Sequence, residues 1–313
     1  MTLAIAGLIG GTLLLFFGAD FIVNGAATLA RKLGISPLVV GLTVVAFGTS
    51  LPEGFVSIVA AIQGNQSICV SNIVGSNIAN VGLIMGLATL LWPVAVAGSL
   101  MRKEMPIMLG ASVLFILFCL NGTVQRWEGG VFLILFILFT VYVLKTTRPT
   151  DDVDMPAVEL SASVPVCVIK IAVGLIMLIA GASFLVNGAV VIARALGVPE
   201  WIIGVTLVAV GTSLPEMATS LVAITKKEDA ISIGNVVGSN IFNILFVIGA
   251  SALVRPLSFT ADSALMTDLG IMLLFSIILY FFMIDRKISR RDGFVLLLGY
   301  CAFIVSIVMR TIQ

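Results

Sequence analysis

Long apolar segments separated by short polar ones run along the whole chain. A helix that crosses a bilayer needs about 20 mostly apolar residues. We predict ten membrane-spanning helices, at residues 3–30, 37–62, 67–93, 104–121, 127–145, 165–193, 199–224, 229–254, 264–284 and 292–310. Several are longer than a straight crossing requires, which indicates tilted or broken helices.

The longest polar gap runs from Lys145 to about Pro165 and carries four acidic residues. We interpret it as a solvated linker, because it is too short for a folded regulatory domain and lacks an EF-hand pattern. An acidic calcium-sensing loop is the alternative. The gap divides the chain into two units of five predicted spans, residues 1–146 and 165–313, joined by the linker 147–164.

The composition fits a surface that faces lipid. Hydrophobic residues make up 60% of the chain and charged residues 11%, whereas a soluble domain carries about 25% charged residues. The net charge of +1 gives no indication of nucleic-acid binding. The chain has no histidine, and its four cysteines form no CxxC pair, which disfavours transition-metal sites and a disulfide framework. We therefore expect an all-α integral membrane protein.

Basic residues are concentrated in alternate loops. With the N-terminus placed outside, 13 of the 17 Lys and Arg residues fall in inner loops and four fall outside. Cytoplasmic loops carry an excess of Lys and Arg. The expected arrangement is a multi-pass protein of the cell membrane, with both termini extracellular or periplasmic and the central linker cytoplasmic.

An internal repeat relates the two halves. A shift of 163 residues aligns residues 18–93 with 181–256 without a gap, and it superimposes GTSLPE at 48–53 on 211–216 and GSNIxN at 75–80 on 238–243. Because each half has an odd number of spans, the second half enters the membrane from the opposite side. The halves are therefore predicted to be inverted repeats, an architecture that places substrate sites near the bilayer midplane.

Glu53 and Glu216 fall deep within their predicted spans. An isolated carboxylate costs at least about 2.5–3.5 kcal/mol there, so each must face a cavity, a cation or a proton. Two carboxylates brought together repel each other unless a cation lies between them. Duplication for packing alone would not call for a paired intramembrane glutamate, so the pair predicts a cation site.

The residues around the glutamates offer further oxygen ligands. In each GTSLPE motif the threonine precedes the glutamate by four residues, and in each GSNIxN motif the serine precedes the last asparagine by four. Each pair is expected to share a helix face. The proline has no N–H, so a carbonyl near Gly48 and another near Gly211 should lose their helical partners. Such oxygens suit hard cations, although a single Ser or Thr could serve only helix packing.

Three other polar residues carry weaker signals. Asp20 lies in the first predicted span, but the repeat has Ser183 at the matching position. We interpret Asp20 as structural or modulating, because a ligand of a symmetric site would be expected in both halves. Asn72 and Asn235 do match, and they could line an access path or simply pack.

Two copies of GTSLPE, each followed by GSNIxN, resemble the two alpha-repeats of the sodium/calcium exchanger, or cation/calcium antiporter, family. The resemblance covers the whole chain. It implies a ten-helix fold in which the second, third, seventh and eighth helices form the ion core, and the first and sixth slide across it. The chain is similar to the minimal, prokaryotic-type members, because it has no large cytoplasmic loop.

The resemblance also implies a set of ion ligands. Calcium would bind the side chains of Glu53 and Glu216 and the backbone oxygens of Thr49 and Thr212. The positions that would bind sodium or line the core are Ser50, Ser76, Asn80, Ser213, Ser239, Asn243 and the backbones of Ala46 and Ala209. Some relatives, including potassium-dependent ones, have Asp in place of the two asparagines. The amides here lower the charge of the site and weaken the case for potassium.

Together these inferences predict a secondary active antiporter that exchanges calcium for sodium by alternating access and moves net charge. A calcium/proton antiporter is the alternative, because a buried Glu can titrate. A passive channel is less favoured, because no filter-like carbonyl motif is present. The sequence has no nucleophile–base pair or phosphate loop, so we expect no enzymatic activity. The expected partners are calcium, sodium and the lipid bilayer, with no cofactor, nucleic acid or obligate protein partner.

Overall fold

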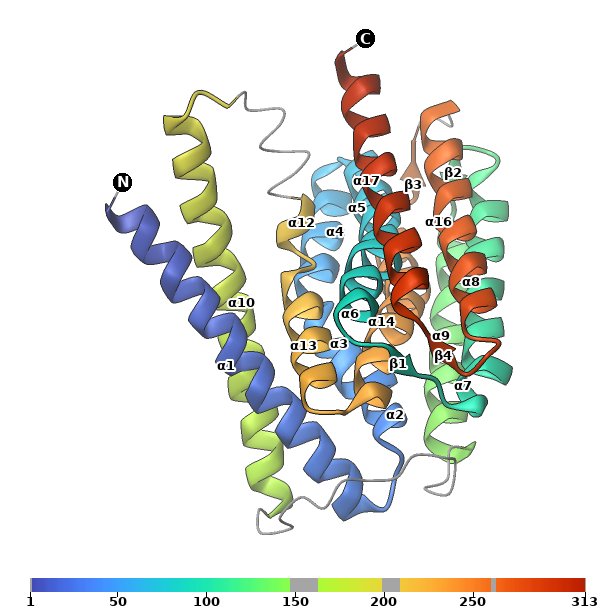
Figure 1. Ribbon diagram of the computed structural model, residues 1–313. Helices are drawn as coiled ribbons and strands as arrows, with labels where there is room; N and C mark the ends of the chain where they lie inside the picture. The colour runs from blue at the N-terminus through green and yellow to red at the C-terminus, as the bar shows by residue number, and fades with distance from the viewer. Residues whose placement is uncertain (1, 147–162, 199–208, 260–262, 313) are drawn as a thin grey trace.

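The computed structural model describes residues 2–146, 163–198, 209–259 and 263–312. Long helices make up most of these residues and run across the molecule in roughly the same direction (Figure 1). The beginning of α1 (Thr2–Leu33) and the end of α17 (Arg290–Ile312) lie at the upper end of the view. The end of α9 (Arg126–Thr146) and the beginning of α10 (Val164–Ala195) lie at the lower end. The first and last described residues therefore share one side, and the residues that flank the central linker lie on the other.

The predicted spans appear as helices within a few residues of their expected ends. Within the described residues, seven helices are long and apolar enough to cross a membrane, and a bent pair over residues 37–63 would make an eighth. Besides α1, α9, α10 and α17, the seven include α16 (Ser263–Phe282) and two composite helices. The composite helices are α5 (Gln66–Ala79), η2 (Asn80–Met85) and α6 (Gly86–Leu91), and α14 (Asp229–Phe242), η4 (Asn243–Ile248) and α15 (Gly249–Val254).

The two remaining predicted spans are partly represented. Helix α8 (Glu104–Cys119) coincides with the predicted span 104–121 but has only 16 residues, and the short α7 (Gly98–Arg102) precedes it. The predicted span 199–224 is described from Ala209 onward, as α12 (Ala209–Gly211) and α13 (Leu214–Thr225), and its first part lies outside the described residues. The described helices are consistent with the ten-helix prediction.

In the described part of the chain, four two-residue strands join the halves. β1 (Val94–Ala95) pairs antiparallel with β4 (Lys287–Ile288), and β2 (Thr123–Val124) pairs antiparallel with β3 (Leu257–Ser258). Each sheet takes one strand from each half of the chain, and the two sheets lie toward opposite ends of the helices (Figure 1). The sequence analysis did not predict them, because two residues are too few to show an alternating pattern. The overall all-helical prediction is confirmed.

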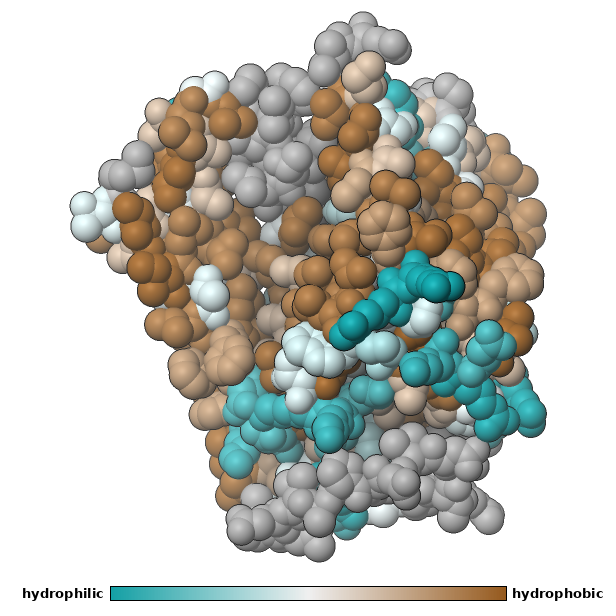
Figure 2. All heavy atoms as spheres, in the orientation of Figure 1, coloured by the Kyte–Doolittle hydropathy of each residue, from teal (hydrophilic) through white to brown (hydrophobic). Residues whose placement is uncertain are grey.

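Helices α1 and α10 form a tilted pair beside the remaining helices (Figure 1). Glycines allow their backbones to approach closely: a Cβ atom at Gly174 would lie 2.6 Å from the carbonyl oxygen of Gly18. Small residues at helix contacts are typical of membrane proteins. Their outer surface is apolar, and Leu3 and Ile176 are 90% and 68% exposed. Figure 2 shows hydrophobic residues over most of this face, with hydrophilic residues gathered toward the lower end. This distribution matches a surface in contact with lipid.

Candidate cation site

Each predicted site glutamate lies in the first turn of a helix that begins at a break. The second predicted span contains α2 (Pro37–Val40), η1 (Gly41–Val45) and α3 (Ala46–Thr49), and then α4 (Leu51–Gln63) at an angle of 48°. Ser50 separates α3 from α4 with φ −84° and ψ 6°, and Ser213 precedes α13 with φ −88° and ψ 4°. Pro52 is accommodated because the first helical turn needs no N–H donor there. The predicted broken helices are therefore confirmed.

The break also corrects one prediction. Thr49 and Glu53 were expected to share a helix face, but Thr49 ends α3 and Glu53 belongs to α4, so no continuous helix joins them. The carbonyl of Gly48, deprived of its helical donor by Pro52, lies instead against the N–H of Ser50. The break places Glu53 at a helix N-terminus, where a negative charge is favoured.

The two glutamates meet in the core through contacts that cross between the halves. The Ser50 hydroxyl donates to Glu216 Oε1 over 2.8 Å, and the Ser213 hydroxyl donates to Glu53 Oε1 over 3.2 Å. Both carboxyl groups are buried, with 1% of each residue exposed. Within the described part of the chain, the second oxygen of each, Oε2, has no hydrogen-bond partner. The pair thus presents two free carboxylate oxygens in a buried site.

A matched pair of asparagines supports the backbone of these glutamates. Asn72 Nδ2 lies 3.4 Å from the carbonyl oxygen of Glu53, and Asn235 Nδ2 lies 3.3 Å from that of Glu216. Asn235 Oδ1 also lies 3.1 Å from the Thr49 hydroxyl, which connects the two halves again. The sequence left packing and an access path open for this pair. The structure gives both a positioning contact.

Two serines that the sequence analysis missed complete these contacts. Asn72 donates to the Ser57 hydroxyl over 2.9 Å, and Asn235 donates to the Ser220 hydroxyl over 3.0 Å. Ser57 and Ser220 are separated by the same 163-residue shift as the motifs. That shared shift was the available signal, although serines in membrane helices often serve packing alone.

The asparagines and serines of the GSNIxN motifs lie in the same buried core. Asn80 and Asn243 are 1% and 0% exposed, and each begins a π-helical segment, η2 or η4. Such segments are frequent at functional sites. Among the described residues, Asn80 Oδ1, Asn243 Oδ1 and Ser239 Oγ have no hydrogen-bond partner. Five buried oxygen atoms of the predicted site, including the two of the glutamates, are therefore free to meet a cation.

The remaining predicted positions lie on the same elements. Thr49 and Ala46 are buried in α3, and the Ala46 carbonyl oxygen accepts from the Ser50 N–H over 3.1 Å. Thr212 is half-buried next to Ser213. Ala209 begins α12, and its side chain lies outside the described part of the structure.

A cavity of about 380 Å³ reaches one side of this core. It lies between α5, α16 and α17, and Asn72 and Ser76 contribute to its lining. Asp268 and Arg310 also line it and form an ion pair of 2.7 Å. The repeat counterparts of Asn72 and Ser76 are Asn235 and Ser239, and both are completely buried. Among the described residues, Asn72 is therefore more accessible than its counterpart Asn235.

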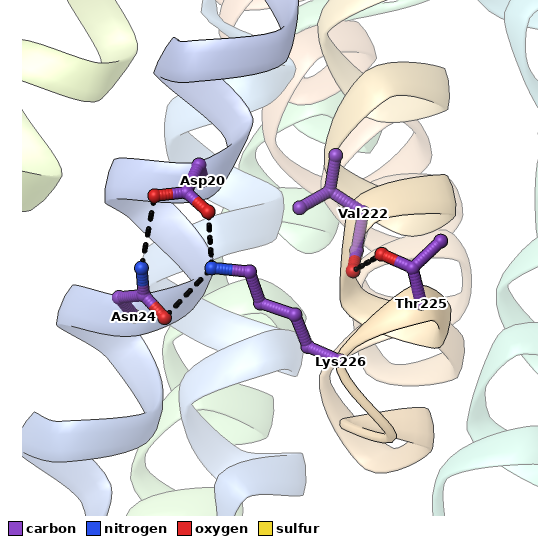
Figure 3. A network of polar contacts seen from close by, with 5 residues as sticks. All are labelled: Asp20, Asn24, Val222, Thr225 and Lys226. Atoms are coloured by element: carbon purple, nitrogen blue, oxygen red, sulfur yellow. Dashed lines mark hydrogen bonds and ion pairs between the residues drawn. The ribbon is translucent and has the colours of Figure 1, made fainter.

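Asp20 has a different role from the core residues. It forms an ion pair with Lys226, which follows α13, and it accepts from Asn24 Nδ2 over 3.0 Å (Figure 3). Lys226 Nζ also donates to Asn24 Oδ1 over 2.8 Å. Asp20 thus faces the α1–α13 contact, which agrees with a structural role.

The donor set fits a hard cation. Among the described residues there is no group of three or more His, Cys, Asp and Glu side chains that could hold a metal ion. The core offers two carboxylates together with hydroxyl and amide oxygens, the ligands of calcium and sodium rather than of softer metals. One divalent cation would cancel the charges of two ionised glutamates.

Comparisons with known proteins agree with this fold. A family model described as "Sodium/calcium exchanger protein" matches residues 3–145 and again 167–309. The sodium/calcium exchanger MaX1 of Methanosarcina acetivorans is 34% identical over 94% of this chain and 95% of its own length. The putative antiporter CaxA of Alkalimonas amylolytica is 37% identical over 94% and 95%. A solved structure of the sodium-calcium exchanger NCX_Mj, soaked with zero Na⁺ and Ca²⁺, has a TM-score of 0.86 at 33% identity and covers 98% of this chain and 99% of its own.

Fold, site and relatives together define an integral membrane antiporter for cations. The family model matches both halves of the chain, and the relatives match it over nearly their full length. The chain belongs to the sodium/calcium exchanger family. The family predicted from the GTSLPE and GSNIxN motifs is therefore confirmed, and so is its fold.

Proposed function

We propose that this protein exchanges calcium for sodium across the cell membrane at one site between the two repeats. The observation that carries the proposal is the pair Glu53 and Glu216: buried, bonded to a serine of the opposite half, and each with one free oxygen. Two buried carboxylates without a counter-charge repel each other. A cation that binds between them removes the repulsion and satisfies the free oxygens. MaX1 and NCX_Mj, which the chain resembles over nearly its full length, are both named as sodium/calcium exchangers.

Calcium would bind the carboxylates of Glu53 and Glu216 and the backbone oxygens of Thr49 and Thr212. Sodium ions would share these oxygens and use more of the core. The additional positions are Ser50, Ser76, Ser213, Ser239 and the backbones of Ala46 and Ala209, with Asn80 and Asn243 lining the remainder. The free oxygens of Ser239, Asn80 and Asn243 support this larger set.

Charge explains why transport would be an exchange. With both glutamates ionised, one calcium ion brings the site to zero charge, whereas three sodium ions, the number that the family resemblance implies, bring it to +1. Exchange would then move net charge, at about 2.3 kcal/mol per charge per 100 mV. An empty site leaves two bare carboxylates, so movement of the gating helices past it would be costly. That cost would tie release of one ion to binding of the other.

Helices α1 and α10 are the elements proposed to alternate access. They pack mainly against each other, and α1 also packs along α13, while α10 makes no comparable contact with α4. Because α1 and α10 contact the core unequally, the two helices can slide together past the core without unfolding the core. In this proposal the repeats are residues 1–146 and 165–313, related by inversion. Both termini are external and the linker 147–164 is cytoplasmic, as the basic residues predict.

A calcium/proton antiporter is the competing function, because the same two glutamates could bind protons instead of sodium. Purified protein in liposomes that contain calcium-free buffer separates the two. Calcium uptake should require an outward sodium gradient. If three sodium ions leave for each calcium ion that enters, one net positive charge leaves the liposome, so an interior-positive potential should increase uptake. Uptake that follows an imposed proton gradient and ignores sodium would establish the competing function. Calcium equilibration without any counter-ion would identify a passive pathway.

A further inference from the structure

Two asparagines outside the ligand set implied by the family lie next to the core. Asn77 and Asn240 are the third residues of the two GSNIxN motifs, one helical turn before Asn80 and Asn243. They are 2% and 1% exposed. Neither has a carboxylate partner, and each contacts the opposite half of the chain.

The four asparagines form a crossed network. Asn77 Nδ2 lies 3.4 Å from the backbone oxygen of Asn240, and Asn240 Nδ2 lies 3.5 Å from the backbone oxygen of Asn77. The side-chain oxygens then accept from the other pair. Asn80 Nδ2 donates to Asn240 Oδ1 over 2.9 Å, and Asn243 Nδ2 donates to Asn77 Oδ1 over 3.1 Å.

The polarity of this network is fixed by the backbone. A carbonyl oxygen can only accept, so the amide nitrogen of Asn77 must face the backbone of Asn240. The oxygen of Asn77 is then left to face Asn243, which must present its own nitrogen. As a result, Asn243 Oδ1 points away from the network. In the same way, Asn240 directs its nitrogen to the Asn77 backbone and its oxygen to Asn80 Nδ2, so Asn80 Oδ1 also points away. Both oxygens are buried and have no partner among the described residues.

We infer that Asn77 and Asn240 are positioning residues that orient the amides of Asn243 and Asn80 so that their oxygens face the transported cation. This inference rests on the proposed function of the site. It also explains why amides suit positions 80 and 243 here. A carboxylate at either position would place an acceptor against the fixed oxygen of Asn240 or Asn77, and no proton would lie between them.

A double-mutant cycle tests the inference, with apparent KM for calcium and for sodium measured in liposomes beside the maximal rate. Loss of one buried hydrogen bond shifts an equilibrium by about tenfold. Whichever of the two KM values, for calcium or for sodium, rises in N80A should also rise in N240A, by about tenfold in each. The double variant N80A/N240A should be no worse than the more severe single variant, because Asn240 acts through Asn80. The cycle of N77A and N243A should behave in the same way.

The controls separate this inference from the proposed function. N121A, at an exposed turn after α8, removes a similar side chain far from the core and should leave both KM values unchanged. Thermal unfolding in detergent reports any general loss of stability. Additive effects in the double variant, or unchanged KM values in N240A and N77A, would overturn the positioning role while wild-type exchange still stands. Absence of calcium and sodium transport in the wild type would instead refute the proposed function.

Discussion

The candidate cation site and the edge of the helix core differ in how closely the contacts of one repeat match those of the other. At the site the hydrogen bonds to the glutamates are matched: Ser50 with Glu216 corresponds to Ser213 with Glu53. At the edge, where α1 passes the loop after α13, the contacts are charged and one-sided. Asp20 pairs with Lys226, and Arg31 pairs with Glu228 over 2.6 Å.

The counterparts of these charged residues cannot form the same pairs. The 163-residue shift replaces Asp20 with Ser183, Lys226 with Gln63 and Glu228 with Asn65. Only Arg31 is matched by another charge, at Arg194. In the proposed function the same ion is bound from both sides of the membrane, which favours matched contacts at the site. The contacts that close one side need not equal those that close the other, so they can set which side is closed.

The largest effect is expected when one member of the matched glutamate pair loses its charge. Glu53→Gln and Glu216→Gln should each lower exchange by about 100-fold or more, because removal of one charged partner from a buried site costs about 3–5 kcal/mol. Sodium-driven calcium uptake in liposomes measures the loss, and size-exclusion profiles show whether the protein folds. Glu128→Gln is the matched control, because Glu128 is also buried but accepts from the backbone N–H of Gln125 at the start of α9. Wild-type uptake in either site variant would remove both glutamates from the ligand set.

A smaller and equal pair of effects is expected at the serines. Ser50→Ala and Ser213→Ala each remove one hydroxyl that donates to the glutamate of the opposite repeat. A hydrogen bond to a charged group contributes about 1.5–3 kcal/mol, so apparent calcium affinity should fall about tenfold or more in both variants. Ser112→Ala is the control, because among the described residues that hydroxyl bonds to the backbone of its own helix at Met108 and to nothing else. Strongly unequal effects of the two site variants would show that the repeats do not share the ion evenly.

Sequence alone was sufficient to select the two glutamates of the candidate site. A glutamate within an apolar span is costly without a partner, so Glu53 and Glu216 could be identified from hydropathy and the repeat. The break at Ser50 followed from Pro52, but its exact residue did not, and the expected shared face of Thr49 and Glu53 was wrong. Helix ends depend on local capping that hydropathy does not report.

Contacts between residues distant in the chain could not be predicted. Asn77 was visible as part of a motif, but its choice of Asn243 as partner depends on how two helices from different halves cross. Lys226 was counted only as an inner basic residue, because nothing in its neighbourhood points to Asp20. Both pairings are properties of the packed helices rather than of local sequence.

The smallest effect is expected at the one-sided contact between α1 and α13. Asp20 and Lys226 are partly exposed, at 30% and 27% of their side chains, and exposed ion pairs contribute about 0.2–1 kcal/mol. Lys226→Gln gives this position the residue of its counterpart, Gln63. It should shift the balance between the two access states by no more than about fivefold, toward opening of the α1–α13 side. Faster hydrogen–deuterium exchange in α1 and α13, with α16 unchanged as an internal control, would report that shift.

The reverse substitution makes the comparison decisive. Gln63→Lys combined with Ser183→Asp places at the counterpart positions the charges that Lys226 and Asp20 carry. Because α10 and α4 are not packed together in this structure, the new pair can form only when that side closes. It should therefore favour the opposite access state and speed exchange in α1 and α13, as Lys226→Gln does. If the pair instead slowed exchange there, or if each single charge had the same effect as the pair, the one-sided contacts would not determine which side is closed.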